Sequence, residues 1–205
     1  MDQKIRRLIL EKAAKTRVKT GGDRLTVRQL AADAKTSTQS IYTLFGGKEG
    51  IVVALFEEGW KRLIDELEQL PVTTEPLEDL LHIGYCYVRF ARKNQHFYEL
   101  MRGKGVAGVS VPDREVSHAE PWLKITRDAV QRAIDAKLLS GSPELIGRQL
   151  WIAAHGHVDL SNHGFLSPKE DESVVRQIAA GVFAAFAGPK HVYRLNQNNV
   201  KDLVR

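Results

Sequence analysis

The sequence predicts an all-α protein, and three observations lead to this prediction. Apolar residues recur at helical spacing along most of the 205-residue chain. Glycine and proline residues separate the periodic segments, as expected where helices end. The glycine-rich stretch 103–113 has no partner segment elsewhere in the chain with which it could form a sheet.

The first helix is predicted over residues 4–19, with an apolar face on one side and Lys and Arg side chains on the other. Gly21-Gly22 is expected to end it. The apolar face is formed by Ile5, Leu8, Ile9 and Ala13.

The segment from Leu25 to Phe45 predicts two short helices separated by a tight turn. Thr26 is placed to cap the first helix, and Gln29 completes a capping-box pattern. Ser37 is placed to cap the second helix, whose first turn holds hydrogen-bonding residues, namely Thr38, Gln39 and Ser40. This is the layout of a helix-turn-helix DNA-binding motif. An ordinary helical hairpin with solvated polar residues is the alternative.

Positive charge is concentrated at the N-terminal end. Residues 1–48 hold eleven Lys and Arg residues against four Asp and Glu residues, a net charge of +7, and the other 157 residues have a net charge of −2. Cationic groups near phosphates release counterions, so this end fits a module that binds a polyanion. A basic surface that serves only solubility is the alternative.

Further helices are predicted after Gly46-Gly47, and they end at proline, glycine or asparagine residues. Their expected ranges are 48–70, 77–93, a short segment from Asn94 to Met101, 115–138, 143–163 and 171–187. The breaks predict three regions, which are a helix-turn-helix domain over residues 1–48, a helical domain over 49–189 and a polar tail over 190–205.

Composition limits where the protein works. No apolar run approaches the roughly 20 residues that a membrane-spanning helix needs, and the N-terminus lacks the apolar core of a signal peptide. The single cysteine, Cys86, excludes an intrachain disulfide and lies among apolar residues, which predicts a buried structural thiol. We therefore expect a cytoplasmic protein with no membrane association.

The stretch Ile41-Tyr42-Thr43-Leu44-Phe45-Gly46-Gly47-Lys48-Glu49 contains an aromatic-x-x-Phe-x-x-Lys-Glu motif at the start of a long helix. Together with the preceding helices, it resembles the DNA-binding domain of TetR-family transcriptional regulators over residues 5–60. More weakly, Leu150-Trp151-Ile152-Ala153-Ala154-His155-Gly156-His157-Val158-Asp159-Leu160 resembles the regulatory domain of the Trp-His-Gly subgroup.

The resemblance implies a set of contacts to double-stranded DNA. Tyr42 and Lys48 would each hold a backbone phosphate, and Gln39 is the candidate for a bidentate adenine contact. The residues expected at the DNA are Thr26, Arg28, Lys35, Ser37, Thr38, Gln39, Ser40, Tyr42, Thr43 and Lys48.

Two positions depart from the family pattern. The family usually has glycine in the turn, and this chain has Lys35, which we expect in a left-handed conformation at some cost. The position before Phe45 is often polar in the family, and Leu44 replaces it, so one phosphate contact is expected to be lost.

The resemblance also implies that the region 49–189 binds a small molecule and forms a homodimer. Candidates for lining a ligand cavity are Tyr87, Phe90, Phe97, Met101, Trp122, Trp151 and His155, with Trp122 the strongest. The alternative is that these side chains belong simply to the core. The helices at 143–163 and 171–187 would form a two-fold interface, helped by Gly156, Ala180, Gly181, Ala184 and Ala185.

His155, Asp159 and His163 recur every four residues, a spacing that could hold a metal but that more often serves interface or core hydrogen bonds. The sequence has no Gly-x-Ser-x-Gly motif and no phosphate-binding loop. We therefore expect neither an enzyme nor a bound metal or cofactor.

The sequence thus favours a dimeric regulator, most simply a repressor, that a small-molecule effector releases from a palindromic operator. The second hypothesis keeps DNA binding but has no small-molecule effector, with control by a protein partner or by abundance. The third is a helical enzyme or metal-binding module with a coincidental helix-turn-helix.

Overall fold

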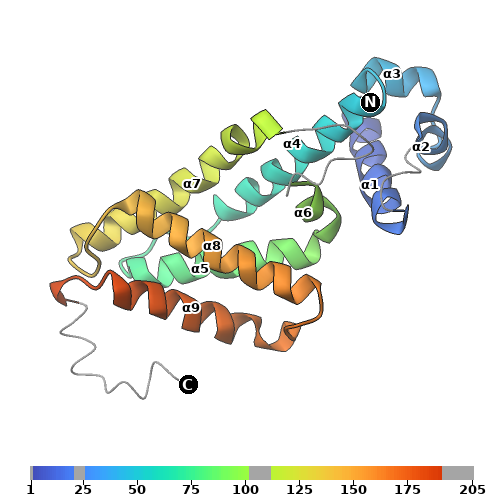
Figure 1. Ribbon diagram of the computed structural model, residues 1–205. Coiled ribbons are helices and arrows are strands. Elements are labelled where there is room, and N and C mark those ends of the chain that lie inside the picture. Colours follow the sequence, from blue (N-terminus) through green and yellow to red (C-terminus); the bar gives the residue numbers. More distant parts are fainter. Residues whose placement is uncertain (1, 21–25, 102–111, 191–205) are drawn as a thin grey trace. The chain divides into compact units, whose positions relative to one another are not determined.

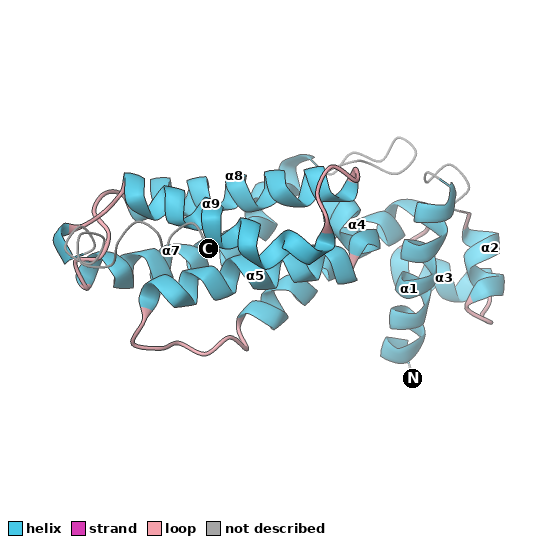
Figure 2. Cartoon of the chain, turned by 90° about the horizontal axis from the view of Figure 1, so that it is seen from below, coloured by secondary structure: helices cyan, strands magenta, loops and turns pink. Residues whose placement is uncertain are grey.

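The computed structural model describes residues 2–20, 26–101 and 112–190, and the predicted all-α class is confirmed there (Figures 1 and 2). Within these ranges, the β-type pairing is a single isolated bridge between Leu139 and Ala187. No helix in the described part of the chain is both long enough and apolar enough to cross a bilayer.

The helices follow the predicted order, with ends within a few residues of those expected. Their bounds are α1 Asp2–Thr20, α2 Val27–Asp33, α3 Thr38–Phe45, α4 Lys48–Leu67, α5 Pro76–Lys93, α6 Gln95–Met101, α7 Pro112–Asp135, α8 Pro143–Asn162, the 3-10 turn η1 Pro168–Glu170 and α9 Asp171–Ala185. The helix stop expected at Gly21-Gly22, most of the glycine-rich stretch 103–113 and the tail 191–205 lie outside the described residues.

The chain divides into two compact units. The first comprises Met1–Leu63 and Asn94–Ala119, and the second comprises Ile64–Lys93 and Glu120–Arg205. The first unit therefore contains α6 in addition to α1, α2, α3 and most of α4.

The first unit is held together around an apolar core, because α1 packs on α2 and α6, and α2 packs on α3. Arg62 of α4 adds a polar connection. Its Nη2 lies 2.7 Å from Glu11 Oε1 of α1, and its Nε donates to Glu58 Oε1 at 2.7 Å. The same guanidinium covers the ring of Phe97 in α6, 4.3 Å from the ring centroid.

In the second unit α5 packs on α8 and α9, and α8 packs on α9 (Figure 1). Asp79 of α5 is buried and accepts hydrogen bonds from the Thr73 hydroxyl at 2.7 Å and from Arg132 of α7 at 2.8 Å. Burial raises the pKa of Asp79, but the hydrogen bonds from Thr73 and Arg132 outweigh it, so the pKa lies below the usual value.

Cys86 in α5 is buried, as predicted. Burial is the main reason that the pKa of its thiol is raised above the usual value. A buried thiol that stays protonated is a structural side chain, because the thiolate is the reactive form.

Candidate DNA-binding surface and ligand site

The start of α2 depends on Thr26, whose extended backbone lets its hydroxyl accept a hydrogen bond from the Gln29 N–H at 3.2 Å. The cap is therefore confirmed. The capping box is not, because the Gln29 side chain donates to Asp33 at 2.8 Å, one turn further along, instead of reaching back to residue 26.

The start of α3 depends on Ser37, whose Oγ accepts the Ser40 N–H at 3.0 Å, as predicted. The Ser40 hydroxyl also lies 2.8 Å from Ser37 Oγ, so both hydroxyls already have a partner. Thr38 and Gln39, which share this first turn, are exposed. The first turn of α3 therefore presents the side chains of Thr38 and Gln39 to solvent.

The turn between α2 and α3 contains Lys35 with φ +52°, which confirms the left-handed conformation expected for a residue where glycine is usual. Its side chain is exposed. The backbone N–H groups of Lys35 and Thr36 donate to carbonyls of α2, to Ala32 at 3.1 Å and Ala31 at 2.9 Å. These two bonds fix the turn that positions α3.

The junction between α3 and α4 is tight. Gly46 ends α3 with φ +72°, and its N–H donates to the Tyr42 carbonyl at 2.8 Å. A Cβ at Gly50 would lie 1.5 Å from the Phe45 carbonyl oxygen, so only glycine fits where α4 begins. This close contact sets where Lys48, the first residue of α4, lies relative to α3.

The aromatic residue of the motif is well exposed. Tyr42 is 54% exposed, and the edge of its ring would be 3.3 Å from a Cβ at Gly47. Thr43 is exposed as well, and its hydroxyl donates to the Gln39 carbonyl at 2.9 Å. Of the ten residues expected at the DNA, eight are exposed, and Ser40 and Lys48 are half-buried.

Four of the seven candidate ligand residues form one aromatic cluster in the second unit. Its members are Tyr87 of α5, Trp122 of α7, and Trp151 and His155 of α8. Ring centroids are 5.7 Å apart for Tyr87 and Trp122, and 5.5 Å apart for Trp122 and Trp151. The Tyr87 hydroxyl lies 3.0 Å from His155 Nδ1, and the two indole N–H groups are buried with no hydrogen-bond partner in the described structure.

The other three candidates lie elsewhere. Phe90 is fully buried in α5, within the second unit. Phe97 and Met101 belong to α6 in the first unit, where Phe97 supports Arg62 and Met101 approaches Gly59. Trp151 also lines a cavity of about 240 Å³ between α7 and α8, together with Leu123, Arg127 and Gly147.

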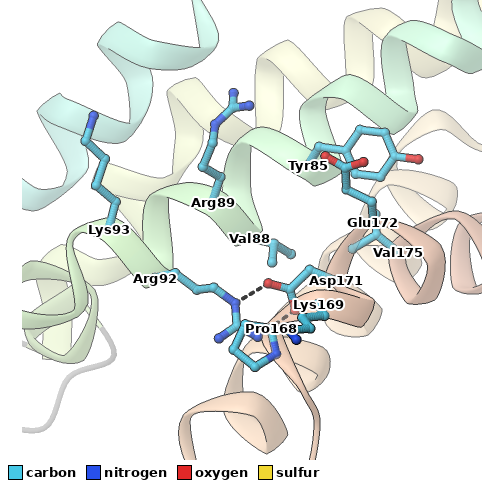
Figure 3. Close-up of a pocket in the computed structure, with 10 residues that line it drawn as sticks. All are labelled: Tyr85, Val88, Arg89, Arg92, Lys93, Pro168, Lys169, Asp171, Glu172 and Val175. Carbon is cyan, nitrogen blue, oxygen red and sulfur yellow. Dashed lines mark hydrogen bonds and ion pairs between the residues drawn. The ribbon is translucent and has the colours of Figure 1, made fainter.

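A second cavity, of about 630 Å³, lies between α5 and the η1–α9 segment and was not predicted from the sequence (Figure 3). Its lining residues are Tyr85, Val88, Arg89, Arg92, Lys93, Pro168, Lys169, Asp171, Glu172 and Val175. The signal available in the sequence was the cluster of cations at the end of α5, which by itself is equally typical of a solvated helix end.

His157 was also missed, because it lies off the face shared by His155, Asp159 and His163. Its buried Nε2 lies 2.7 Å from Asp171 Oδ1, and Arg92 pairs with the same carboxylate. His163 Nδ1 lies 2.8 Å from the Asp159 carbonyl oxygen. Among the described residues no three His, Cys, Asp or Glu side chains are grouped as a metal site would require.

The fold and the α2–α3 geometry define a helix-turn-helix protein in which a helical region follows the motif along the chain. The family model of bacterial regulatory proteins of the tetR family matches residues 9–55, and that of the tetracyclin repressor-like C-terminal domain matches residues 80–181. The chain belongs to the TetR family. It is therefore a transcriptional regulator with a DNA-binding domain, and not an enzyme.

Solved structures share the fold. A protein of unknown function from Rhodococcus sp. RHA1 is 25% identical with TM-score 0.75, over 89% of this chain and 95% of that one. The TetR-family regulator PfmR from Thermus thermophilus is 22% identical with TM-score 0.69, over 86% and 97%. SmeT in complex with triclosan is 20% identical with TM-score 0.67, over 90% and 92%. A comparison with curated protein sequences found no match.

Proposed function

We propose that the protein is a homodimeric repressor that binds a palindromic operator and is released from it by a small-molecule effector. The observation that carries the proposal is the exposed first turn of α3, with Thr38 and Gln39 facing solvent. This is the end of a recognition helix that meets base edges in the major groove. A protein of this kind acts on DNA in the cytoplasm.

In this proposal the ten candidate residues divide the work of DNA recognition. Gln39 reads an adenine and Arg28 a guanine edge, while Tyr42 and Lys48 hold phosphates. Because the Thr43 hydroxyl is engaged by the Gln39 carbonyl, its methyl group is the part available for a thymine methyl. Phosphate contacts are also supported at the N-termini of α2 and α3, where Thr26 and Ser37 lie, and in the turn at Lys35. Ser40, in the first turn of α3, is the tenth residue expected at the DNA.

The dimer would form through α8 and α9. α8 exposes large apolar side chains at positions seven and eight apart, namely Leu145, Ile152 and Leu160. On α9, Gly181, Ala184 and Ala185 are exposed, and a Cβ at Gly156 or Gly181 would have no neighbour within 4 Å in the chain. An apolar face with room for a close approach fits a second copy of the same two helices. Such a dimer would place two recognition helices about 34–36 Å apart.

The effector would bind at the aromatic cluster of Tyr87, Trp122, Trp151 and His155. Two buried indole N–H donors without partners leave a cost of about 1–3 kcal/mol each, which a ligand acceptor group would relieve. The structurally similar SmeT is known in complex with triclosan. A coupling of about 1–3 kcal/mol between this site and the DNA would suffice for release.

The test is selection of bound duplexes from a random DNA pool at about 150 mM salt, where non-specific binding is weak. One palindromic motif is the expected result, and Gln39→Ala should relax the preference at one position of each half-site. Recovery of no motif, with binding that only fades as salt rises, would refute sequence-specific recognition.

A regulator without a small-molecule effector is the second candidate, because Trp122 is only 2% exposed and the cluster is densely packed. The selected duplex distinguishes the two candidates. Under the effector hypothesis, screening compounds for release of that duplex yields an active one, and Trp122→Ala reduces release while sparing DNA affinity. Failure of the whole screen, with intact DNA binding, would favour control by a protein partner or by abundance.

A further inference from the structure

The 630 Å³ groove between α5 and η1–α9 has no part in the proposed function. Its volume lies within the range of about 300–1,000 Å³ that is usual for small-molecule sites. None of the seven candidate ligand residues lines it. All of its lining residues belong to the second unit, so the groove is defined without reference to the first.

Two ion-pair clusters connect α5 to α9 beside the groove. At one end Arg92 pairs with Asp171, whose Oδ1 also lies 2.7 Å from the buried His157 (Figure 3). At the other end Arg176 lies 3.4 Å from Glu78. The Asp171 carboxylate is therefore already neutralised and does not repel an anion.

Three cations of the lining have no ion pair with a described residue. They are Arg89, Lys93 and Lys169, and in Figure 3 neither Arg89 nor Lys93 reaches the Arg92–Asp171 pair. Glu172 is the one lining carboxylate that remains, so the groove carries a net excess of positive charge.

The floor of the groove is apolar. Val88 of α5 and Val175 of α9 are buried, and the Tyr85 ring and Pro168 complete the wall. Inorganic phosphate would leave this apolar surface unused. A ligand with an anionic end and an apolar body would use both parts.

The groove stays open in the proposed dimer. Ala184 lies nine residues after Val175, which at about 100° per residue places it on the opposite side of α9. Gly181 lies about 120° from Val175 by the same measure, so Gly181 and Ala184 of the proposed dimer face point away from the groove. Ala185 of the same face lies nearer to it, at about 80°.

We propose that this groove binds an amphipathic carboxylate, with its apolar body on Val88, Val175 and Pro168 and its carboxylate attracted by the excess positive charge of Arg89, Lys93 and Lys169. The site is separate from the aromatic cluster and requires no DNA. It would make the protein responsive to a second, chemically distinct ligand.

The experiment is isothermal titration calorimetry of the full-length protein with decanoate, and with decan-1-ol as the uncharged match. Decanoate should bind once per protomer, at least about tenfold more tightly than decan-1-ol. Each exposed cation removed should cost up to about fivefold, so Arg89→Gln/Lys169→Gln should weaken binding by up to about 25-fold. Lys124→Gln removes an exposed cation from α7, outside the groove, and should change binding less than twofold.

Methyl NMR of the valine-labelled protein locates the ligand, with Val88→Ile and Val175→Ile to assign the two signals. Shifts at both valines are expected. No binding at about 1 mM decanoate, on the order of the weakest specific affinities, would overturn the proposal, as would equal binding of decan-1-ol. Quenching of Trp122 and Trp151 without valine shifts would place decanoate in the aromatic cluster, so the groove proposal would fail while the proposed function stood.

Discussion

The guanidinium of Arg62 lies 4.3 Å from the centroid of the Phe97 ring, and this contact joins α4 to α6 within the first unit. Arg62 also lies 2.7 Å from a Glu11 oxygen of α1, so one side chain contacts three helices. The pair with Glu11 is an ion pair between partly buried groups, so its contribution is mainly electrostatic.

We expect Arg62→Met to destabilise the protein by about 2 kcal/mol, because it removes the ring contact and the charged hydrogen bond to Glu58. Arg62→Lys keeps the charge but loses the flat stacking surface, and should cost about half as much. Denaturant unfolding followed by circular dichroism measures both. Arg7→Met, an exposed change on α1, is the control. Equal stability of Arg62→Met and the control would contradict the assignment.

Lys48→Ala should weaken binding to all duplexes similarly and lower the salt slope by about one unit, because a phosphate contact is lost. Fluorescence anisotropy across a salt series gives the slope. Lys61→Ala, more than three turns further along α4, is the control and should leave the slope unchanged. An unaltered slope in Lys48→Ala would remove this residue from the DNA contacts.

Lys35→Gly should stabilise the protein by about 1 kcal/mol, because glycine adopts φ +52° without the steric cost that lysine has. The same change should weaken DNA binding if the Lys35 ammonium contacts a phosphate. Lys137 has φ +61° in the second unit, so Lys137→Gly is a matched control. It should stabilise equally in thermal unfolding and leave DNA affinity as it was. A destabilised Lys35→Gly would show that the turn tolerates lysine without strain.

Asp79→Asn should lower the free energy of unfolding by about 2 kcal/mol at neutral pH, because the carboxylate loses its charged hydrogen bond with Arg132. The pKa of Asp79 is depressed in the folded state, so its contribution is present above the unfolded value and is lost as the pH falls through the folded one. The difference between the two proteins should therefore shrink below about pH 4. Urea unfolding at several pH values measures this, with Asp128→Asn, an exposed carboxylate, as control. If the difference in free energy of unfolding between the wild type and Asp79→Asn did not vary with pH, the effect would be assigned to packing.

Ile152→Asp should convert the proposed dimer to monomer, because a charge would replace a side chain that is 61% exposed in the single chain. Sedimentation velocity determines the mass. Val72→Asp introduces the same charge at another exposed apolar residue, in the loop between α4 and α5, and should leave the mass unchanged. A dimer that survives Ile152→Asp would place the interface elsewhere.

Local features were predictable from the sequence. The helix order, the Thr26 and Ser37 caps and the left-handed Lys35 depend on residues within one turn of each other, and all agree with the structure. The Gln29 side chain shows the limit of local patterns. It hydrogen-bonds Asp33 on the same helix instead of completing the capping box, and the capping-box pattern does not take residue 33 into account.

Long-range pairs were not predictable. Arg92 and Asp171 are 79 residues apart, and His157 joins them only because α8 and α9 pack together. The same limit applies to the candidate ligand residues, since helical spacing identifies aromatic side chains but not the unit to which they belong. Phe97 and Trp122 were both candidates from the sequence, and they lie in different compact units.

The chain passes between the two compact units three times, after Leu63, after Lys93 and after Ala119. A fragment that stops after α3 or early in α4 therefore lacks α6, the helix that packs against α1 within the first unit. The compact unit that holds the DNA-binding region is consequently not one continuous segment of the chain. Fusing only the first 60 or so residues to another protein would transfer the recognition helix without α6. To exchange the whole first unit between relatives, the chain would have to be joined at all three points where it passes from one unit to the other.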